Sequence, residues 1–184
     1  MNLTGKLLVA MPALGDPRFD RAVILICDHS PRGAIGLMVN KPLADITFSD
    51  LMSQMDIPQS GAGRPIRILF GGPVERARGF VLHSPEYSGG QATIRVGDAF
   101  GMTATLDVLE ALAKGDGPAQ AFLALGYSGW GPGQLEGEIA RNDWLTAEAS
   151  PGLIFGSADG AKWAAALKEI GIDPLTLSPI SGRA

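Results

Sequence analysis

The segment that most limits the possible folds is the continuous apolar run Ala22–Cys27. It is short, β-branched and free of helical periodicity, so it predicts a strand over residues 21–28 that is buried on both faces. Turn-forming residues occupy positions 29–33, and a second strand is expected at 34–40, where the proline of Lys41-Pro42 ends it. So short a connection predicts that the two strands form a hairpin.

Other short apolar segments, separated by glycine and proline, continue this pattern along the chain. We expect strands at 7–11, 66–70, 79–83, 92–105 (as one strand or two), 119–125, 144–147 and 153–155, and helices capped by Thr47 and at 106–114, 132–140 and 161–170. This order predicts an α+β fold, in which about four helices surround a mixed, mainly antiparallel sheet. With 184 residues and no linker or repeat, we expect residues 1–184 to form a single domain.

Charge and composition exclude several function classes. The net charge is −4 and no basic stripe is present, so nucleic acid is not an expected partner. No segment approaches the roughly 18 apolar residues of a membrane helix. The single cysteine, Cys27, cannot form an intramolecular disulfide, which favours a cytoplasmic protein with Cys27 as a small buried apolar residue.

The glycine-rich stretch Gly126–Gln134 is the first candidate site. Glycines let backbone N–H groups approach an anion, and Pro132 suits the first turn of a following helix. A nucleophile elbow would need glycine in place of Trp130, and a phosphate loop would need lysine and a hydroxyl in place of Pro132 and Gly133. The alternative is a tight strand-to-helix turn in which Trp130 packs on the core.

Arginines around Gly71-Gly72-Pro73 form a second candidate site. The four arginines that flank this turn could clamp a phosphate or a carboxylate, and they are Arg64, Arg67, Arg76 and Arg78. Arg67, however, alternates with isoleucines on a strand, which equally fits a solvated face. Gly71 and Gly72 themselves fit a turn that needs glycine.

Two histidines complete the set of candidate groups. His83, at the end of a strand, fits either a general base or a hydrogen-bonded structural group. His29 follows Cys27 and Asp28, but adjacent strand residues point to opposite faces, so we expect no metal site. A triad that combines Ser128 and His83 with an aspartate remains open, although no local motif supports it.

Several of these motifs occur in the order found in one family of bacterial proteins. They are Gly5–Pro12, Asp28-His29, Gly33–Pro42, Gly71–Val74, Gly79–His83 and Gly126–Glu136, followed by Glu138 and Trp144. Over essentially the whole chain, the sequence resembles the YqgE/AlgH family. The resemblance implies a bifurcated, partly barrel-like sheet surrounded by helices. It implies a regulatory role, because AlgH is named for regulation of alginate production in pseudomonads, and it supplies no catalytic residues.

These observations favour a non-enzymatic regulatory protein that binds a small molecule or a protein, without a cofactor or metal. We expect its site where the candidate residues at strand ends meet, and these are Asn40, Gly71, Gly72, His83, Tyr127, Ser128, Trp130 and Gln134. Two alternatives stay open. One is a hydrolase of a small anion that uses His83 as base, and the other is a DNA-associated regulator that uses the four arginines.

Overall fold

The computed structural model describes residues 1–156 and 158–177. Its strands are β1 (Lys6–Ala10), β2 (Val23–Ser30), β3 (Gly33–Met38), β4 (Arg67–Phe70), β5 (Val74–His83), β6 (Thr93–Val96), β7 (Phe100–Thr103), β8 (Ala121–Trp130) and β9 (Trp144–Glu148). They form one sheet in the order β6-β7-β5-β8-β3-β2-β1-β9, and β4 also pairs with β8. The β4–β8 pair is parallel and the other pairs are antiparallel. The mixed, mainly antiparallel sheet predicted from the sequence is confirmed.

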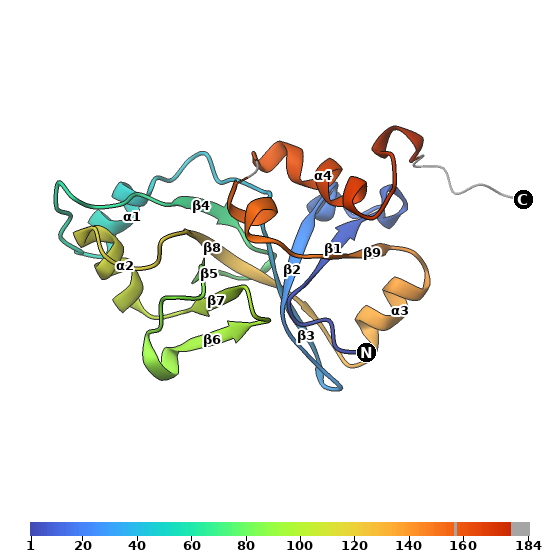
Figure 1. Ribbon diagram of the computed structural model, residues 1–184, viewed down its shortest axis with the longest axis horizontal. Helices are drawn as coiled ribbons and strands as arrows, with labels where there is room; N and C mark the ends of the chain where they lie inside the picture. Colours follow the sequence, from blue (N-terminus) through green and yellow to red (C-terminus); the bar gives the residue numbers. More distant parts are fainter. Residues whose placement is uncertain (157, 178–184) are drawn as a thin grey trace, which may run out of the picture.

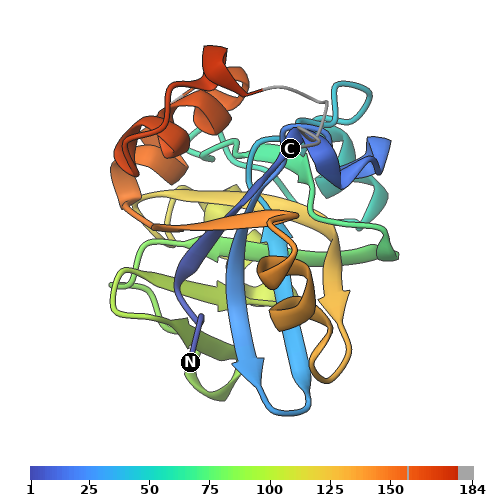
Figure 2. The ribbon, with the colours of Figure 1, turned by 90° about the vertical axis from the view of Figure 1, so that its right-hand side faces the viewer.

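The sheet divides at β8, whose two halves pair with different strands. Its first half, Ala121–Leu125, lies between β4 and β5, whereas Ser128–Trp130 pairs with β3. The sheet therefore curls and branches, as Figures 1 and 2 show. The β2 strand is buried on both faces, because Ile24 and Ile26 enter one apolar cluster whereas the alternate residues Val23, Leu25 and Cys27 enter another.

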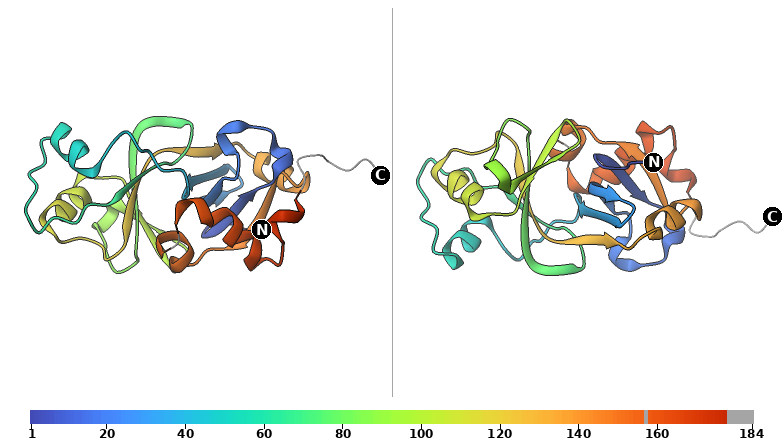
Figure 3. Two further views of the ribbon diagram at one scale, coloured as in Figure 1. Left: turned by 90° about the horizontal axis from the view of Figure 1, so that it is seen from above. Right: turned by 90° about the horizontal axis from the view of Figure 1, so that it is seen from below.

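Four α-helices cover the described part of the sheet: α1 (Phe48–Gln54), α2 (Leu106–Lys114), α3 (Gln134–Ala140) and α4 (Lys162–Glu169). The first two lie together at one end of the long axis, whereas α3 and α4 belong to the other half (Figures 1 and 3). The expected cap of α1 is confirmed, because Thr47 and Asp50 form a capping box. No helix among the described residues is long and apolar enough to cross a membrane.

Three element assignments differ from the sequence-based expectations. Residues 153–155 lie in a π-helical turn, Gly152–Gly156, and not in a strand. The Ser150 carbonyl oxygen accepts a hydrogen bond from the Ile154 N–H, which starts the helical turn. The β5 strand begins at Val74 and not at residue 79. The Tyr127–Trp130 segment continues β8, since its pairing with β3 holds it extended. Residues 92–105 form two strands, one of the two alternatives considered.

Candidate functional site

The structure brings together four of the expected site residues: Gly71, Gly72, Tyr127 and Ser128. A Cβ atom on Gly71 would lie 2.2 Å from the Gly126 carbonyl oxygen, and one on Gly72 would lie 2.1 Å from the Tyr127 carbonyl carbon. These glycines therefore permit two backbone segments to pack directly against each other. Ser128 is buried with its hydroxyl 3.5 Å from the Gly71 carbonyl oxygen, and Tyr127 packs edge-on against Phe80.

Trp130 and Gln134 lie around Glu138, which sequence reasoning did not select as a site residue. The Glu138 carboxylate accepts from the indole N–H groups of Trp130 and Trp144, both at 2.8 Å, and from the Gln134 amide at 2.9 Å. The two indole rings meet edge to face with centroids 6.1 Å apart. This arrangement fastens α3 to β8 and β9. The four-residue spacing of Gln134 and Glu138 on one helix face was the available signal.

His83 lies at the opposite end of the β5–β8 pair and is fully buried. In register it faces Ala121, whereas Val74 at the other end of β5 faces Tyr127. Its Nδ1 donates to the Ser84 carbonyl oxygen at 2.8 Å, and its Nε2 lies 2.8 Å from the Thr103 hydroxyl. Both ring nitrogens are thus engaged. The geometry gives His83 neither the cleft nor the free nitrogen that a general base requires.

We expect the burial of His83 to make stability depend on pH. Burial lowers the pKa of His83 below its usual value, since desolvation disfavours the charged ring. Between this lowered pKa and the unfolded value of about 6.5, the unfolded chain binds more protons, so stability falls as pH falls. The decrease is at most about 1.4 kcal/mol per pH unit. Denaturant titrations of wild type and His83→Gln between pH 5 and 7 should show this slope only in wild type, and equal slopes would contradict the assignment.

The four candidate arginines are not gathered at one site. Arg64 donates to the carbonyl oxygens of Pro118 and Ala119. Arg76 and Arg78 lie over the rings of Phe70 and Phe80, with guanidinium-to-centroid distances of 5.5 and 5.0 Å. Arg67 instead reaches Asp159 at 2.5 Å, beside the end of α4. A single four-arginine clamp is therefore not formed.

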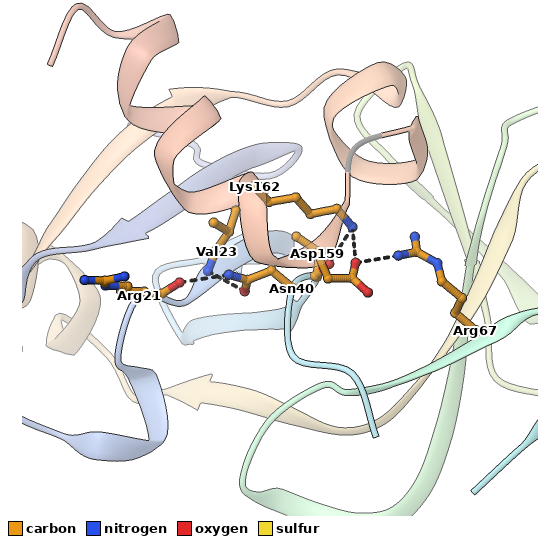
Figure 4. A network of polar contacts seen from close by, with 7 residues as sticks. Arg21, Val23, Asn40, Arg67, Asp159 and Lys162 are labelled. Atoms are coloured by element: carbon orange, nitrogen blue, oxygen red, sulfur yellow. Dashed lines mark hydrogen bonds and ion pairs between the residues drawn. The ribbon is translucent and has the colours of Figure 1, made fainter. Parts of the chain in front are cut away.

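Arg67 and Asn40 belong to a polar network beneath α4 (Figure 4). The Asn40 side chain accepts from the Val23 N–H at 2.9 Å and donates to the Arg21 carbonyl oxygen at 2.8 Å. These bonds hold the chain where Arg21 adopts a left-handed conformation, with φ of 51°. Such a conformation is uncommon outside glycine, asparagine and aspartate, and it is stabilised here by the amide of Asn40.

Lys162 is the centre of the same network and its side chain is fully buried. Its ammonium donates to the Val39 carbonyl oxygen at 2.7 Å and to Asp159 at 2.8 Å. Desolvation lowers the pKa of Lys162, while the hydrogen bond that its ammonium donates to Asp159 opposes this change. The Asp159 carboxylate is shared between Lys162 and Arg67, so α4 is joined to both β4 and the residue after β3.

Beside this network lies a cavity of about 330 Å³, which we call the α4 cavity. It is lined by Arg21, Asn40, Lys41, Asp159, Gly160, Trp163, Ala164, Pro174 and Leu175. The Arg21 guanidinium stacks over the Trp163 ring at 5.3 Å, and the Trp163 indole is fixed by its bond to the Ala10 carbonyl oxygen. Lys41 donates to the Asp20 carbonyl oxygen. The cavity therefore offers two cations and an aromatic wall.

The chemistry of the α4 cavity suits an anion and not a metal. Its one carboxylate among the lining residues, Asp159, is already bonded to two cations. Among residues 1–156 and 158–177, no group of three His, Cys, Asp or Glu side chains is placed to hold a metal ion. Cys27 is buried, as expected, and burial raises the pKa of its thiol to about 12, so it is not a reactive nucleophile.

Comparisons with known proteins agree with the motif pattern. A family model described as AlgH-like matches residues 7–175. The chain is 59% identical to a UPF0301 protein of Cereibacter sphaeroides over 184 residues, which cover all of both proteins. It is also 59% identical over 187 residues to a UPF0301 protein of Ruegeria pomeroyi, again with full coverage of both.

Solved structures give the same result. The solution structure of AlgH from Pseudomonas aeruginosa matches with a TM-score of 0.81 and 35% identity, covering 100% of this chain and 97% of that one. Protein DIP2367 of Corynebacterium diphtheriae shares the fold alone, with a TM-score of 0.72 and 22% identity over 95% of this chain and 89% of its own. This chain belongs to the AlgH-like, or UPF0301, family.

Proposed function

We propose that the protein is a non-enzymatic regulatory protein of the cytoplasm, working as a single domain, that binds a small anionic ligand in the α4 cavity. The observation that carries this proposal is the local charge. Arg21 and Lys41 line the cavity, and its one lining carboxylate, Asp159, is already paired with Arg67 and Lys162, in a chain whose net charge is −4. A local excess of cations around a concave site favours anions even when the whole chain repels them.

The shape of the cavity narrows the class of ligand. Its volume of about 330 Å³ is at the lower end of the range for small-molecule sites. Trp163 and Leu175 supply apolar surface beside the cations, so an anion with a flat apolar group fits better than a bare ion. Arg21 supplies planar donors suited to a carboxylate or a phosphate.

The proposal keeps Asn40 and Arg67 from the sequence-derived set, in changed roles. Asn40 fixes the backbone of Arg21, and Arg67 neutralises Asp159, so both prepare the site. The tightly packed glycines Gly71 and Gly72 serve the scaffold. The four candidate arginines are dispersed and already make contacts within the protein. This supports a small molecule as the ligand and argues against duplex DNA, which needs a continuous basic surface.

Binding of benzoate, phenyl phosphate and inorganic phosphate should distinguish this site from general charge attraction. We expect the two aromatic anions to perturb the amide and indole NMR signals of Arg21 and Trp163. The double variant Arg21→Gln/Lys41→Gln should weaken their binding about tenfold or more, since each charged hydrogen bond contributes about 1.5–3 kcal/mol. Isothermal titration calorimetry at low salt would measure the change.

A matched control has the same change in net charge at distant exposed positions. Arg95 and Lys114 are exposed and lie on β6 and at the end of α2. The variant Arg95→Gln/Lys114→Gln should therefore bind as wild type does. Equal weakening by both double variants would reduce the effect to general electrostatics, and absence of binding by every probe at millimolar concentration would refute the proposal.

A further inference from the structure

His29 is turned toward the core by an irregularity in β2. The pairing of β2 with β3 shifts between Ile26 and Asp28, so Cys27 is the extra residue of a β-bulge. Beyond the bulge the alternation of side chains is reversed. Asp28 is exposed, whereas His29 falls on the same face as Ile26, because their partners in β3 are two residues apart. Only 4% of the His29 side chain is exposed, so the bulge places a titratable ring inside the fold.

Both ring nitrogens of His29 are engaged, and they face groups of different kinds. Nδ1 accepts from the Leu3 N–H at 3.0 Å, and Nε2 lies 2.8 Å from a carboxylate oxygen of Glu136 on α3. A nitrogen that accepts carries no hydrogen, and an ionised carboxylate only accepts, so this geometry requires the neutral ring with its hydrogen on Nε2. Protonation adds a hydrogen to Nδ1. Two N–H donors then face each other, so the protonated ring cannot hold Leu3.

The charges around His29 come from three elements. Glu136 of α3 is 54% exposed and is placed to pair with the protonated ring. The N-terminal segment contributes the Met1 ammonium, which acts on the same carboxylate. On the hairpin of β2 and β3, Asp28 and Arg32 are exposed to solvent. The protonated ring thus gains a counter-ion in Glu136, whereas the backbone N–H that it releases has no second acceptor in the part of the chain that the structure describes.

The segment that His29 holds contacts both halves of the branched sheet. Leu3 is 4% exposed and packs in the apolar cluster to which β2 and α3 contribute. The Gly5 N–H donates to the Ile26 carbonyl oxygen at 2.8 Å. A Cβ atom on Gly5 would lie 3.1 Å from the Cα atom of Gly97, in the turn between β6 and β7. Loss of the bond to Leu3 therefore frees a segment that lies against β2 on one side and the β6–β7 turn on the other.

We propose that His29 is a proton-controlled latch for the N-terminal segment, residues 1–5. The neutral ring holds the segment closed, and protonation opens it by removing the acceptor of the Leu3 N–H. Opening uncovers the apolar surface of β2 and α3 that Leu3 covers. One proton is linked to opening, so the ratio of open to closed molecules rises by at most about tenfold for each pH unit of acidification. None of these groups lines the α4 cavity, so the latch is independent of the proposed function.

Nitrogen-15 NMR of the His29 ring and the Leu3 amide between pH 8 and pH 5 tests the latch in the wild-type protein. At pH 8 we expect the ring hydrogen on Nε2 and a Leu3 N–H that is protected from exchange. As the ring gains its proton, this protection, corrected for the intrinsic pH dependence of exchange, should fall with the same midpoint while the amides of β8 stay protected. A ring hydrogen on Nδ1 at pH 8, or a Leu3 N–H that stays protected when His29 is protonated, would overturn the proposal.

Three variants separate the latch from general destabilisation by acid. His29→Asn places an amide oxygen near the position of Nδ1 but cannot titrate, so protection of the Leu3 N–H should no longer depend on pH. Glu136→Gln removes the charge that favours the protonated ring, so opening should need a pH lower by about half a unit. His83→Gln removes the other histidine of the chain and should leave the midpoint of opening unchanged. Opening that still depends on pH in His29→Asn, or a midpoint that moves in His83→Gln and not in Glu136→Gln, would refute the latch.

Discussion

Replacement of Asp159 by alanine should destabilise the fold by about 3–5 kcal/mol, because it leaves the Lys162 ammonium buried without a counter-charge. The remaining acceptor, the Val39 carbonyl oxygen, is neutral and does not offset the desolvation of the ammonium. Arg67 also loses its partner but is 41% exposed, so water solvates it at little cost. Chemical denaturation at neutral pH would measure the loss.

The double variant Asp159→Ala/Lys162→Met separates this cause from simple loss of contacts. Removing the ammonium removes the uncompensated charge, so the double variant should be more stable than Asp159→Ala alone. Asp159→Ala should also regain stability as the pH rises toward 10. Burial lowers the pKa of Lys162 below the unfolded value of about 10.4, and between these values the unfolded chain binds more protons. Additive losses of stability on the two substitutions, together with a stability of Asp159→Ala that does not change with pH, would contradict the role assigned to the Asp159–Lys162 pair.

Gly72→Ala should destabilise the fold by about 3 kcal/mol or more. The new Cβ would stand 2.1 Å from the Tyr127 carbonyl carbon and 2.3 Å from the Ser128 nitrogen. Both atoms belong to the backbone of β8, which is paired on both sides and cannot move as a flexible side chain can. Thermal and denaturant unfolding of purified protein would measure the effect.

Gly61→Ala is the matched control for this substitution. A Cβ on Gly61 has no atom within 4 Å, and the residue has no positive φ, so alanine should change stability by less than about 1 kcal/mol. Comparable losses in the two variants would show that chain flexibility, and not the close approach at Gly72, is the cause.

Local sequence patterns predicted the secondary structure wherever neighbouring residues decide it. The buried strand at β2, the cap at Thr47 and the helix end at Gly115 each depend on residues within one turn of the chain. The strand assigned to residues 153–155 was wrong, because three apolar residues fit a strand and a helical turn equally well. The hydrogen bond from the Ile154 N–H to the Ser150 carbonyl oxygen and the packing of Leu153 and Ile154 in the core favour the helical turn.

The site was harder to predict, because its parts come from distant segments. Arg21, Lys41 and Trp163 have no shared motif, and they meet only when α4 packs beside the ends of β2 and β3. Glycine motifs drew attention to Gly71, Gly72 and Gly126, where the close approach proved to be between backbone segments. No local signal marked Lys162, since a buried lysine looks like a surface lysine in sequence.

The strand β8 contributes to two different apolar clusters of the core, one from each of its faces. The Phe122 ring centroid lies 5.8 Å from the Lys162 ammonium beneath α4, whereas the next residue, Leu123, packs on the opposite face of the strand in the cluster that contains Met52 of α1 and Leu109 of α2. A shift of this strand toward either side changes both environments together. If a ligand in the α4 cavity displaces β8, the packing of α1 and α2 must change with it, and thermodynamic reciprocity requires that a change in this packing alters the affinity of the ligand.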